Sequence, residues 1–95
     1  MTSIRVGEFE WNDEKARVNH AKHGVSFEEA TTVFIDELAV PFEDIAHPER
    51  LVLIGESYLR RVLLVVFTER LASGTIRIVS ARRATRRERR AYEED

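Results

Sequence analysis

The sequence contains no cysteine, and this absence excludes several kinds of chemistry at once. Without thiols, the chain forms no disulfides, uses no thiolate nucleophile and holds no metal through sulfur. Its longest strongly apolar run, Val62 to Phe67, is about a third of what a membrane-spanning helix needs. The first residues also lack the apolar stretch of a secretory signal peptide. We therefore expect a cytoplasmic protein that does not contact a membrane.

No repeat, low-complexity tract or linker interrupts the 95 residues. Their hydrophobic content of 43% is typical of an ordinary globular domain. A chain of this length and composition builds one modest core. We therefore predict a single domain that spans residues 1–95.

The charge of the chain is nearly balanced overall but strongly uneven along its length. The formal net charge is −2, yet 5 basic and 12 acidic residues lie in the part that ends at Glu56. The remaining part holds 10 basic and 5 acidic residues, so the two parts carry −7 and +5. A local basic face can attract a polyanion even when the total charge is acidic. The alternative is that the two parts neutralise each other within the fold.

The N-terminal third of the sequence predicts a strand followed by a helix. Apolar and polar residues alternate from Ile4 to Trp11, with an interruption near Gly7, as in a short strand. Asn12 or Asp13 can cap the helix that follows. Gly24 is a glycine signal for the end of that helix.

A second helix is predicted directly after the first. Ser26 followed by Glu29 has the spacing of a capping box. The apolar face of this helix is formed by Phe27, Ala30, Val33 and Phe34. The turn between the two helices, Lys22 to Ser26, is therefore tightly specified.

The central part of the sequence changes to strand-like patterns joined by short polar segments. The expected strands are Leu38 to Asp44, Leu51 to Gly55, Val62 to Thr68 and Thr75 to Ala81. Links this short predict an antiparallel meander, with Pro41 suited to an edge strand and Val62 to Phe67 to a central strand covered on both faces. The fold class is then α+β: two N-terminal helices, a four-stranded antiparallel meander sheet and a C-terminal helix.

Six arginines within residues 82 to 90 form the densest feature of the sequence: Arg82, Arg83, Arg86, Arg87, Arg89 and Arg90. Thr85 and Glu88 form a capping box for a last helix that runs toward Asp95. This helix has arginines in its first turn and acidic residues at its end, the reverse of what the helix dipole favours. Either the arginines bind an anion, for which phosphate is favoured, or they pair with the acidic first part of the chain.

The expected hairpin of the last two strands suggests how some arginines are placed. If Val62 to Thr68 pairs with Thr75 to Ala81, then Arg61 and Arg82 emerge side by side at its open end. They would grip one phosphate there. Arg70 would lie roughly 20 Å away at about 3.3 Å per residue, and so serve another purpose.

A ribonuclease without metal needs a group that takes the proton of a ribose 2′-hydroxyl, a group that protonates the leaving oxygen, and cations for the phosphorane. His23 is the histidine on the ordered turn and is the candidate for proton transfer. The alternative is that His23 only caps the helix end. His20 and His23 have no further ligands at zinc-like spacing, so we expect no metal and no cofactor.

Other side chains near these segments have both a functional and a structural interpretation. Glu69 and Glu88 are possible bases, although Glu88 also has a capping role. Tyr92 lies one turn beyond Glu88, where its ring can stack on a base or simply pack. Lys15 and Lys22 can contact phosphate or be solvated.

Three segments carry a resemblance to a known family: FEWNDEKARVNHAKHGVSFEEATTVF, RVLLVVFTER and IRIVSARRATRRERRAYE. Read together, they resemble the BrnT toxins, the partners of BrnA antitoxins in type II toxin-antitoxin systems. The similarity runs from about Phe9 to Glu93, and the order of KHGVSFEEA, TER and SAR-A followed by E and Y is its most specific part. The sequence departs from the family at Arg60, where glycine is common, at Glu37, where proline is common, and in its short Ala46 to Arg50 loop.

The resemblance implies a bacterial protein with a fold similar to RelE-type ribonucleases that cleaves RNA without metal and thereby inhibits translation and growth. It implies a BrnA-like antitoxin that binds tightly and represses the operon, so that DNA is reached only through the complex. The residues expected in catalysis are His23, Arg61, Arg70, Arg82 and Tyr92. Those expected to bind RNA are Lys15, Lys22, Arg83 and Arg86.

The leading hypothesis is therefore an endoribonuclease toxin in which His23 transfers protons and Arg61 with Arg82 stabilises the phosphorane. Tyr92 and Arg70 would position the RNA, and the product would be a 2′,3′-cyclic phosphate. One alternative is a non-enzymatic nucleic-acid-binding regulator that uses the same arginines only for phosphate contacts. Another is a protein-interaction module whose arginine patch docks an acidic partner.

Overall fold

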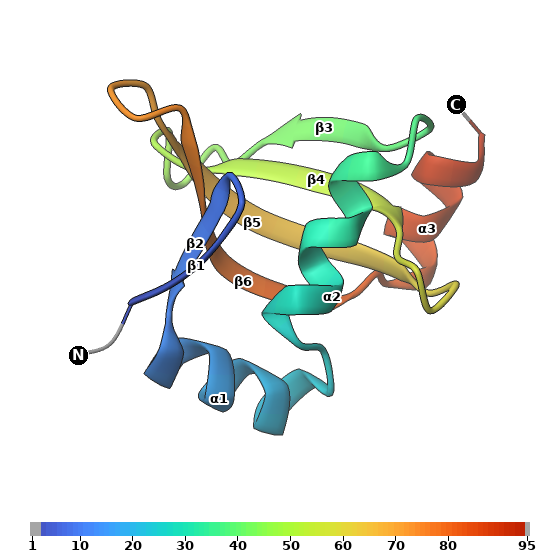
Figure 1. Cartoon of the computed structure of the whole chain (residues 1–95). Helices are drawn as coiled ribbons and strands as arrows, with labels where there is room; N and C mark the ends of the chain where they lie inside the picture. The colour runs from blue at the N-terminus through green and yellow to red at the C-terminus, as the bar shows by residue number, and fades with distance from the viewer. Residues whose placement is uncertain (1–2, 95) are drawn as a thin grey trace.

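One sheet organises the fold, with two helices packed on one face and a third helix at one end (Figure 1). A computed structural model describes residues 3–94. The strands are β1 (Ser3–Val6), β2 (Phe9–Asn12), β3 (Val40–Glu43), β4 (Leu51–Glu56), β5 (Val62–Arg70) and β6 (Thr75–Arg83). The helices are α1 (Asp13–His23), α2 (Phe27–Thr32), the 3-10 turn η1 (Val33–Ile35) and α3 (Arg86–Glu93). Asp95, toward which the last helix was expected to run, lies outside the described residues.

The sheet has the order β1-β2-β6-β5-β4-β3 and is larger than the sequence predicted. The antiparallel meander from β3 to β6 is confirmed. The expectation of four antiparallel strands is wrong in two respects, because β1 and β2 add a hairpin and β2 runs parallel to β6. The single interrupted strand expected at the N-terminus is this hairpin, since Gly7 takes a φ of 60° that lets the chain reverse.

The core lies between the sheet and the helices α1 and α2. Its buried members are Trp11, Val25, Phe27, Ala30, Val33, Leu63, Val65, Phe67, Ile78 and Ala81. Trp11 and Phe27 meet edge to face with ring centroids 6.0 Å apart, so β2 packs directly against α2. The caps predicted for α1 are present: the Asn12 side chain accepts from Lys15 N, and Gly24 ends the helix with a φ of 69°.

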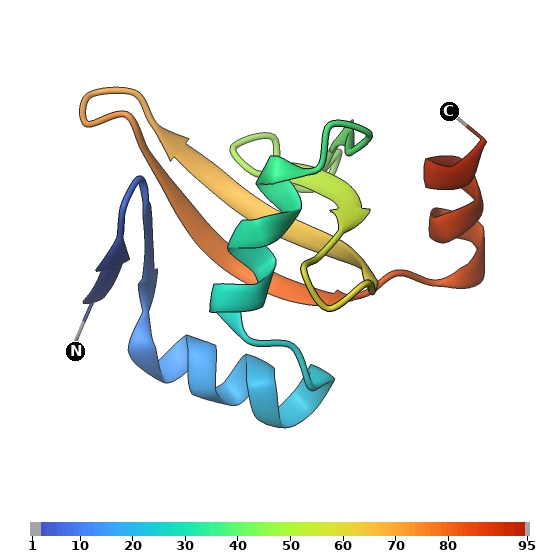
Figure 2. The ribbon, with the colours of Figure 1, turned by 45° about the vertical axis from the view of Figure 1, so that its right-hand side comes forward.

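The second face of the sheet is only partly covered, which differs from the prediction that β5 is buried on both sides. Leu63 and Val65 are fully buried under the helices, whereas Leu64 and Val66 on the other face are half-buried. The helix α3 covers only one end of this face, near β4. Figure 2 shows α3 standing apart from α1 and α2, beyond the end of β6. We call this less covered side the open face.

Gly55 shows how closely β4 approaches the rest of the molecule. A Cβ at this position would lie 2.9 Å from both Ala39 Cβ and Val33 Cγ1. The strand can therefore pass η1 only without a side chain there. No helix within residues 3–94 is long and apolar enough to cross a membrane.

Candidate nucleic-acid interface

Two hollows adjoin one another along β6 and together form the candidate site. The larger, of about 720 Å³, lies on the open face with an apolar floor that includes Val52, Leu64 and Val66. The smaller, of about 340 Å³, lies between β6 and α1. Ser80 lines both hollows, so they meet at this strand.

The larger hollow carries cationic groups on the side of α3. Arg82, Arg87 and Glu88 line it there. Two hydrogen bonds of 2.8 and 2.9 Å join the Arg82 guanidinium to the Glu88 carboxylate, and a third of 3.2 Å reaches the carbonyl of Arg83. The bonds from Arg82 hold the pKa of Glu88 below its usual range despite partial burial. Arg82 is thus held in one orientation at the wall of the hollow.

The capping box predicted at the start of α3 is present in both directions. Thr85 Oγ1 accepts from Glu88 N at 3.2 Å, and Glu88 Oε1 accepts from Thr85 N at 2.8 Å. Glu88 therefore caps the helix and binds Arg82 with the same carboxylate. The orientation of Arg82 depends on the correct folding of the first turn of α3.

The smaller hollow contains the histidine and lysines that the sequence predicted. His23, Lys22 and Lys15 line it, together with Val79 and Ser80. The side chain of His23 is half-buried and makes no hydrogen bond or ion pair with the residues described, 3–94. Helix α1 ends instead through the bond from Gly24 N to the carbonyl of His20, so the imidazole is not the cap.

Arg61 and Arg82 do not lie side by side, and the expectation that they grip one phosphate is wrong. The strands are longer than predicted and Arg82 is opposite Leu64, not opposite Arg61. A register shift between Val66 and Phe67 moves the pairing further. Because side chains alternate along β5, Arg61 points toward the helices and Arg82 toward the open face.

Arg61, which is partly exposed, forms an ion pair with the buried carboxylate of Glu29 in α2. Its Nε donates to Glu29 Oε2 at 3.0 Å, its Nη2 donates to Glu29 Oε1, and the same Nη2 donates to the carbonyl of Gly24 at 3.1 Å. The hydroxyl of Ser57 adds a bond of 2.6 Å to Glu29 Oε2. Burial alone would raise the pKa of Glu29, but the bonds from Arg61 and Ser57 outweigh it and lower that pKa.

The position of Glu29 corrects the capping box predicted for α2. Ser26 Oγ accepts from Glu29 N at 3.0 Å, as expected. The Glu29 side chain does not return to the Ser26 backbone, because it points inward to Arg61 and Ser57. A Ser-x-x-Glu spacing fits either outcome, and the position of Arg61 from a distant segment decides between them.

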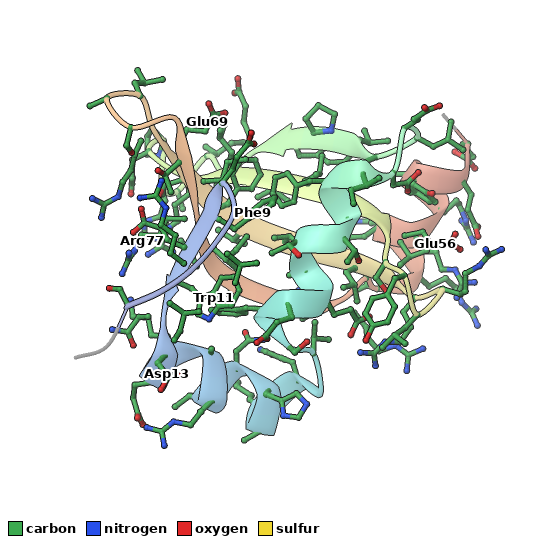
Figure 3. The ribbon with its side chains drawn as sticks, viewed as in Figure 1. Phe9, Trp11, Asp13, Glu56, Glu69 and Arg77 are labelled. Atoms are coloured by element: carbon green, nitrogen blue, oxygen red, sulfur yellow. The ribbon has the colours of Figure 1, made fainter. Side chains whose placement is uncertain are left out.

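Arg70 lies at the other end of the sheet from Arg82. It is six residues along β5 from the partner of Arg82, about 20 Å at 3.3 Å per residue. Its Nε is 3.7 Å from Glu10 Oε1, and Glu10 also binds Arg77 Nη1 at 2.6 Å. Figure 3 shows Arg77 and Glu56 at opposite ends of the sheet. The separation predicted for Arg70 is confirmed.

Tyr92 ties α3 to the end of η1. Its hydroxyl donates to Asp36 Oδ2 at 2.6 Å, and the same carboxylate accepts from Glu56 N at 2.8 Å and Leu38 N at 3.0 Å. Burial and the bond to Asp36 raise the pKa of Tyr92 to about 12. Asp36 itself has a lowered pKa, because these three hydrogen bonds outweigh the effect of burial. The Tyr92 hydroxyl thus has a structural partner.

The two interpretations of the basic part of the chain apply to different arginines. Four of them pair with acidic residues of the first part of the chain: Arg60, Arg61, Arg70 and Arg77. Arg82 and Arg89 pair with carboxylates of α3 itself. Four make no ion pair within residues 3–94: Arg83, Arg86, Arg87 and Arg90. Charge complementation therefore accounts for the arginines of residues 60–77, whereas four arginines in or next to α3 have no acidic partner among the described residues.

Four features of the site were not predicted from the sequence. The Glu29 and Asp36 carboxylates, the Glu10 partner of two arginines, and the apolar hollow of the open face were all missed. Only for Asp36 was there a local signal, since an aspartate before a turn often accepts from the amide two residues ahead. The other three depend on pairings between distant segments. No group of three or more metal-ligating side chains occurs within residues 3–94.

The comparisons with known proteins agree with the resemblance seen in the sequence. Residues 11–88 match a family model described as the ribonuclease toxin BrnT of type II toxin-antitoxin systems. The chain is also similar to the 1.1 Å crystal structure of the Brucella abortus ribonuclease toxin, BrnT. That match has a TM-score of 0.65 and 27% sequence identity, and it covers 80% of this chain and 94% of the other. No curated protein sequence matches the chain.

Proposed function

This chain belongs to the BrnT family of ribonuclease toxins of type II toxin-antitoxin systems, and we propose that it cleaves RNA on the joined hollows along β6. The observation that carries the proposal is the shared residue Ser80, which links the hollow of His23 to that of Arg82. A proton-transfer group and a fixed guanidinium thereby border one surface. A single strand of RNA lying across Ser80 would meet both.

The RNA backbone is held by charge on both sides of Ser80. Lys15 and Lys22 offer ammonium groups in the smaller hollow. Beyond Arg82, the cations without ion-pair partners, Arg83 and Arg86, extend the basic surface toward α3. Each phosphate contact releases counterions, so binding weakens steeply as salt rises. Arg70 is placed to contact a phosphate several nucleotides away, because about 20 Å of β5 separates it from Arg82.

The proposed reaction is an in-line transfer that requires no metal ion. The ribose 2′-oxygen attacks phosphorus as His23 removes its proton, and the bond from phosphorus to the 5′-oxygen breaks. Arg82 stabilises the additional negative charge of the phosphorane. The leaving 5′-oxygen takes a proton from water, so that one product ends in a 2′,3′-cyclic phosphate and the other begins with a 5′-hydroxyl.

The other two residues expected in catalysis receive different roles from their contacts. The ion pair with buried Glu29 favours a structural role for Arg61, since its guanidinium lies on the helix side of the sheet and not on the open face with Arg82. Tyr92 holds α3 through Asp36, which leaves its ring and not its hydroxyl as the group for an RNA base. Both roles are tested by the variants below.

A BrnA-like antitoxin is the proposed protein partner. The apolar floor of the larger hollow, with Leu64 and Val66, suits aliphatic side chains of a protein segment, while the arginines of α3 suit acidic residues beside that segment. A partner bound there would cover Arg82. Neutralisation then follows from competition with RNA for one surface, and contact with operator DNA would come through the antitoxin.

A second candidate function is binding of nucleic acid without cleavage, as in a regulator. The observation that favours it is the pairing of Arg61 and Arg82 with Glu29 and Glu88, which leaves no arginine of the predicted catalytic set without an acidic neighbour. In that case RNA stays intact after long incubation, although binding still weakens with salt.

Induced expression of the chain alone in a bacterial host, followed by mapping of RNA ends, distinguishes these functions. We expect growth arrest and new RNA ends, both lost with Arg82→Ala and with His23→Ala. Circular dichroism of the purified variants checks that they are folded. Healthy growth with intact RNA and soluble wild-type protein would favour the binding regulator, and a fully toxic Arg82→Ala would defeat the role given to that residue.

A further inference from the structure

Asn19 connects the two sides of the candidate site through three buried hydrogen bonds. Its Nδ2 donates to the carbonyl of Val25 at 3.0 Å and to the carbonyl of Ala81 at 2.8 Å. Its Oδ1 accepts from Ala81 N at 3.2 Å. The residue is only 7% exposed although it lies on α1, a helix whose other surface is largely polar.

The bonds to Ala81 replace a missing strand. β2 pairs with β6 only at Ile76 and Arg77, so the later part of β6 has a free edge on that side. A side-chain amide carries a carbonyl acceptor and two N–H donors, one of which points to the same side as the oxygen, so it can pair with both backbone groups of one residue. Asn19 therefore satisfies both backbone groups of Ala81 as a neighbouring strand would. This fixes α1 to β6 at one register.

The two segments that Asn19 joins are those that carry the proposed chemistry. Val25 belongs to the turn that follows His23, whereas Ala81 lies between Ser80 and Arg82. Arg61 holds the same turn from the other side by donating to the carbonyl of Gly24 at 3.1 Å. Among these contacts, the Asn19 amide is the one that joins the turn of His23 directly to the strand of Arg82.

We propose that Asn19 is a positioning residue that sets the distance between His23 and Arg82 across Ser80. This inference rests on the proposed ribonuclease function for its catalytic part. The coupling of the turn to β6 is independent of that function. Misplacement of a catalytic group by about 1 Å can reduce a rate about a hundredfold, so the effect on cleavage should exceed the effect on binding.

The test compares Asn19→Ala with Val33→Ala, a matched loss of buried contacts in the core under α2 and η1. Cleavage of a single-stranded RNA and binding of the same RNA with methylated 2′-hydroxyls are measured where both variants are fully folded. Asn19→Ala should lose about a hundredfold in kcat with little change in binding, and Val33→Ala should keep both. Equal cleavage by the two variants would overturn the proposal.

Asn19→Asp adds a readout that loss of stability alone does not produce. Its carboxylate still accepts from Ala81 N but has no donor for the two carbonyls, whereas the protonated carboxyl regains one donor. The ratio of its kcat to that of the wild type should therefore rise as pH falls. A ratio independent of pH would contradict a role for the donated hydrogen bonds.

Amide hydrogen exchange separates a failure of the inference from a failure of the proposed function. In Asn19→Ala, exchange should accelerate together in the turn at residues 22–25 and in β6 at residues 80–82. Acceleration in one segment alone would overturn the coupling, whether or not the wild type cleaves RNA. A wild type that binds but does not cleave would refute the catalytic part and the proposed ribonuclease, while the exchange result would still decide the coupling.

Discussion

Arg82 and Glu88 face one another at the edge of the open face, joined by two hydrogen bonds of 2.8 and 2.9 Å. The carboxylate orients the guanidinium but also neutralises it. An RNA phosphate at this place must therefore share Arg82 with Glu88 or displace it. Substitution of Glu88 separates orientation from neutralisation.

Glu88→Gln should increase the affinity for single-stranded RNA several-fold, about 1 kcal/mol for removal of one negative charge near bound phosphate. The amide oxygen can still accept from Thr85 N, so α3 should keep its start. Affinity is measured by titration at several salt concentrations. If Glu88 were the catalytic base, cleavage would be lost in this variant, whereas retention of cleavage supports His23.

His23→Ala should reduce kcat by a factor of about 10² to 10⁴, the usual contribution of a general acid or base, and leave RNA binding nearly unchanged. His20→Ala is the matched control, because His20 is an exposed histidine on the same helix that does not line the hollow of His23. Equal effects of the two substitutions on cleavage would remove His23 from the mechanism.

Arg61→Ala should destabilise the fold by about 3 kcal/mol, because it leaves Glu29 buried without its partner. Denaturant unfolding gives the free energy of unfolding. In a Glu29→Gln background the same substitution should cost less, since no buried charge remains. A folded and stable Arg61→Ala that fails to cleave RNA would restore the catalytic role predicted from the sequence.

The Glu29 to Arg61 pair should also make stability depend on acidic pH. The folded chain holds the pKa of Glu29 below its ordinary value of 4.5. Its contribution is thus complete above about pH 4.5 and is lost as pH falls through the lowered pKa of the folded state. Thermal unfolding from neutral to acidic pH should show this loss in the wild type, and the loss should be smaller in Glu29→Gln.

Tyr92→Phe should reduce stability by about 1 kcal/mol through loss of the hydrogen bond to Asp36. If the ring alone stacks on RNA, binding and cleavage should be retained. Because folding raises the pKa of Tyr92 to about 12, its contribution is present below the unfolded value near 10 and is lost as pH rises toward 12. An ultraviolet titration of Tyr92→Phe should lack the tyrosinate absorbance that appears near pH 12 in the wild type.

Arg60→Gly should leave the fold unchanged or stabilise it by up to about 1 kcal/mol. Arg60 has a φ of 63° and follows a turn closed by its own N–H on the carbonyl of Ser57. A left-handed residue after such a turn is what a three-residue hairpin loop requires. Glycine suits the position because it adopts a positive φ without strain. A clear loss of stability in Arg60→Gly would contradict the view that the positive φ of Arg60 is strained.

The sequence by itself determined the local structure wherever neighbouring residues supply both partners of an interaction. Asn12, Gly24 and Thr85 cap their helices as their spacing predicts, because a cap needs only groups within one turn of chain. The meander from β3 to β6 follows from alternating patterns and short links. The family was recognisable for a similar reason, since its motifs are short contiguous segments.

Only the tertiary structure decided which charges act together. The face on which Arg61 and Arg82 point depends on strand register, and an odd-numbered shift reverses it. Likewise, Glu29 became the partner of an arginine and not a helix cap because the fold brings α2 beside Arg61, which directly precedes β5. Asn19 connects His23 to the neighbour of Arg82 through contacts across 62 residues of chain. Interactions between segments so distant leave no periodic pattern in the sequence, because their geometry exists only after the chain has packed.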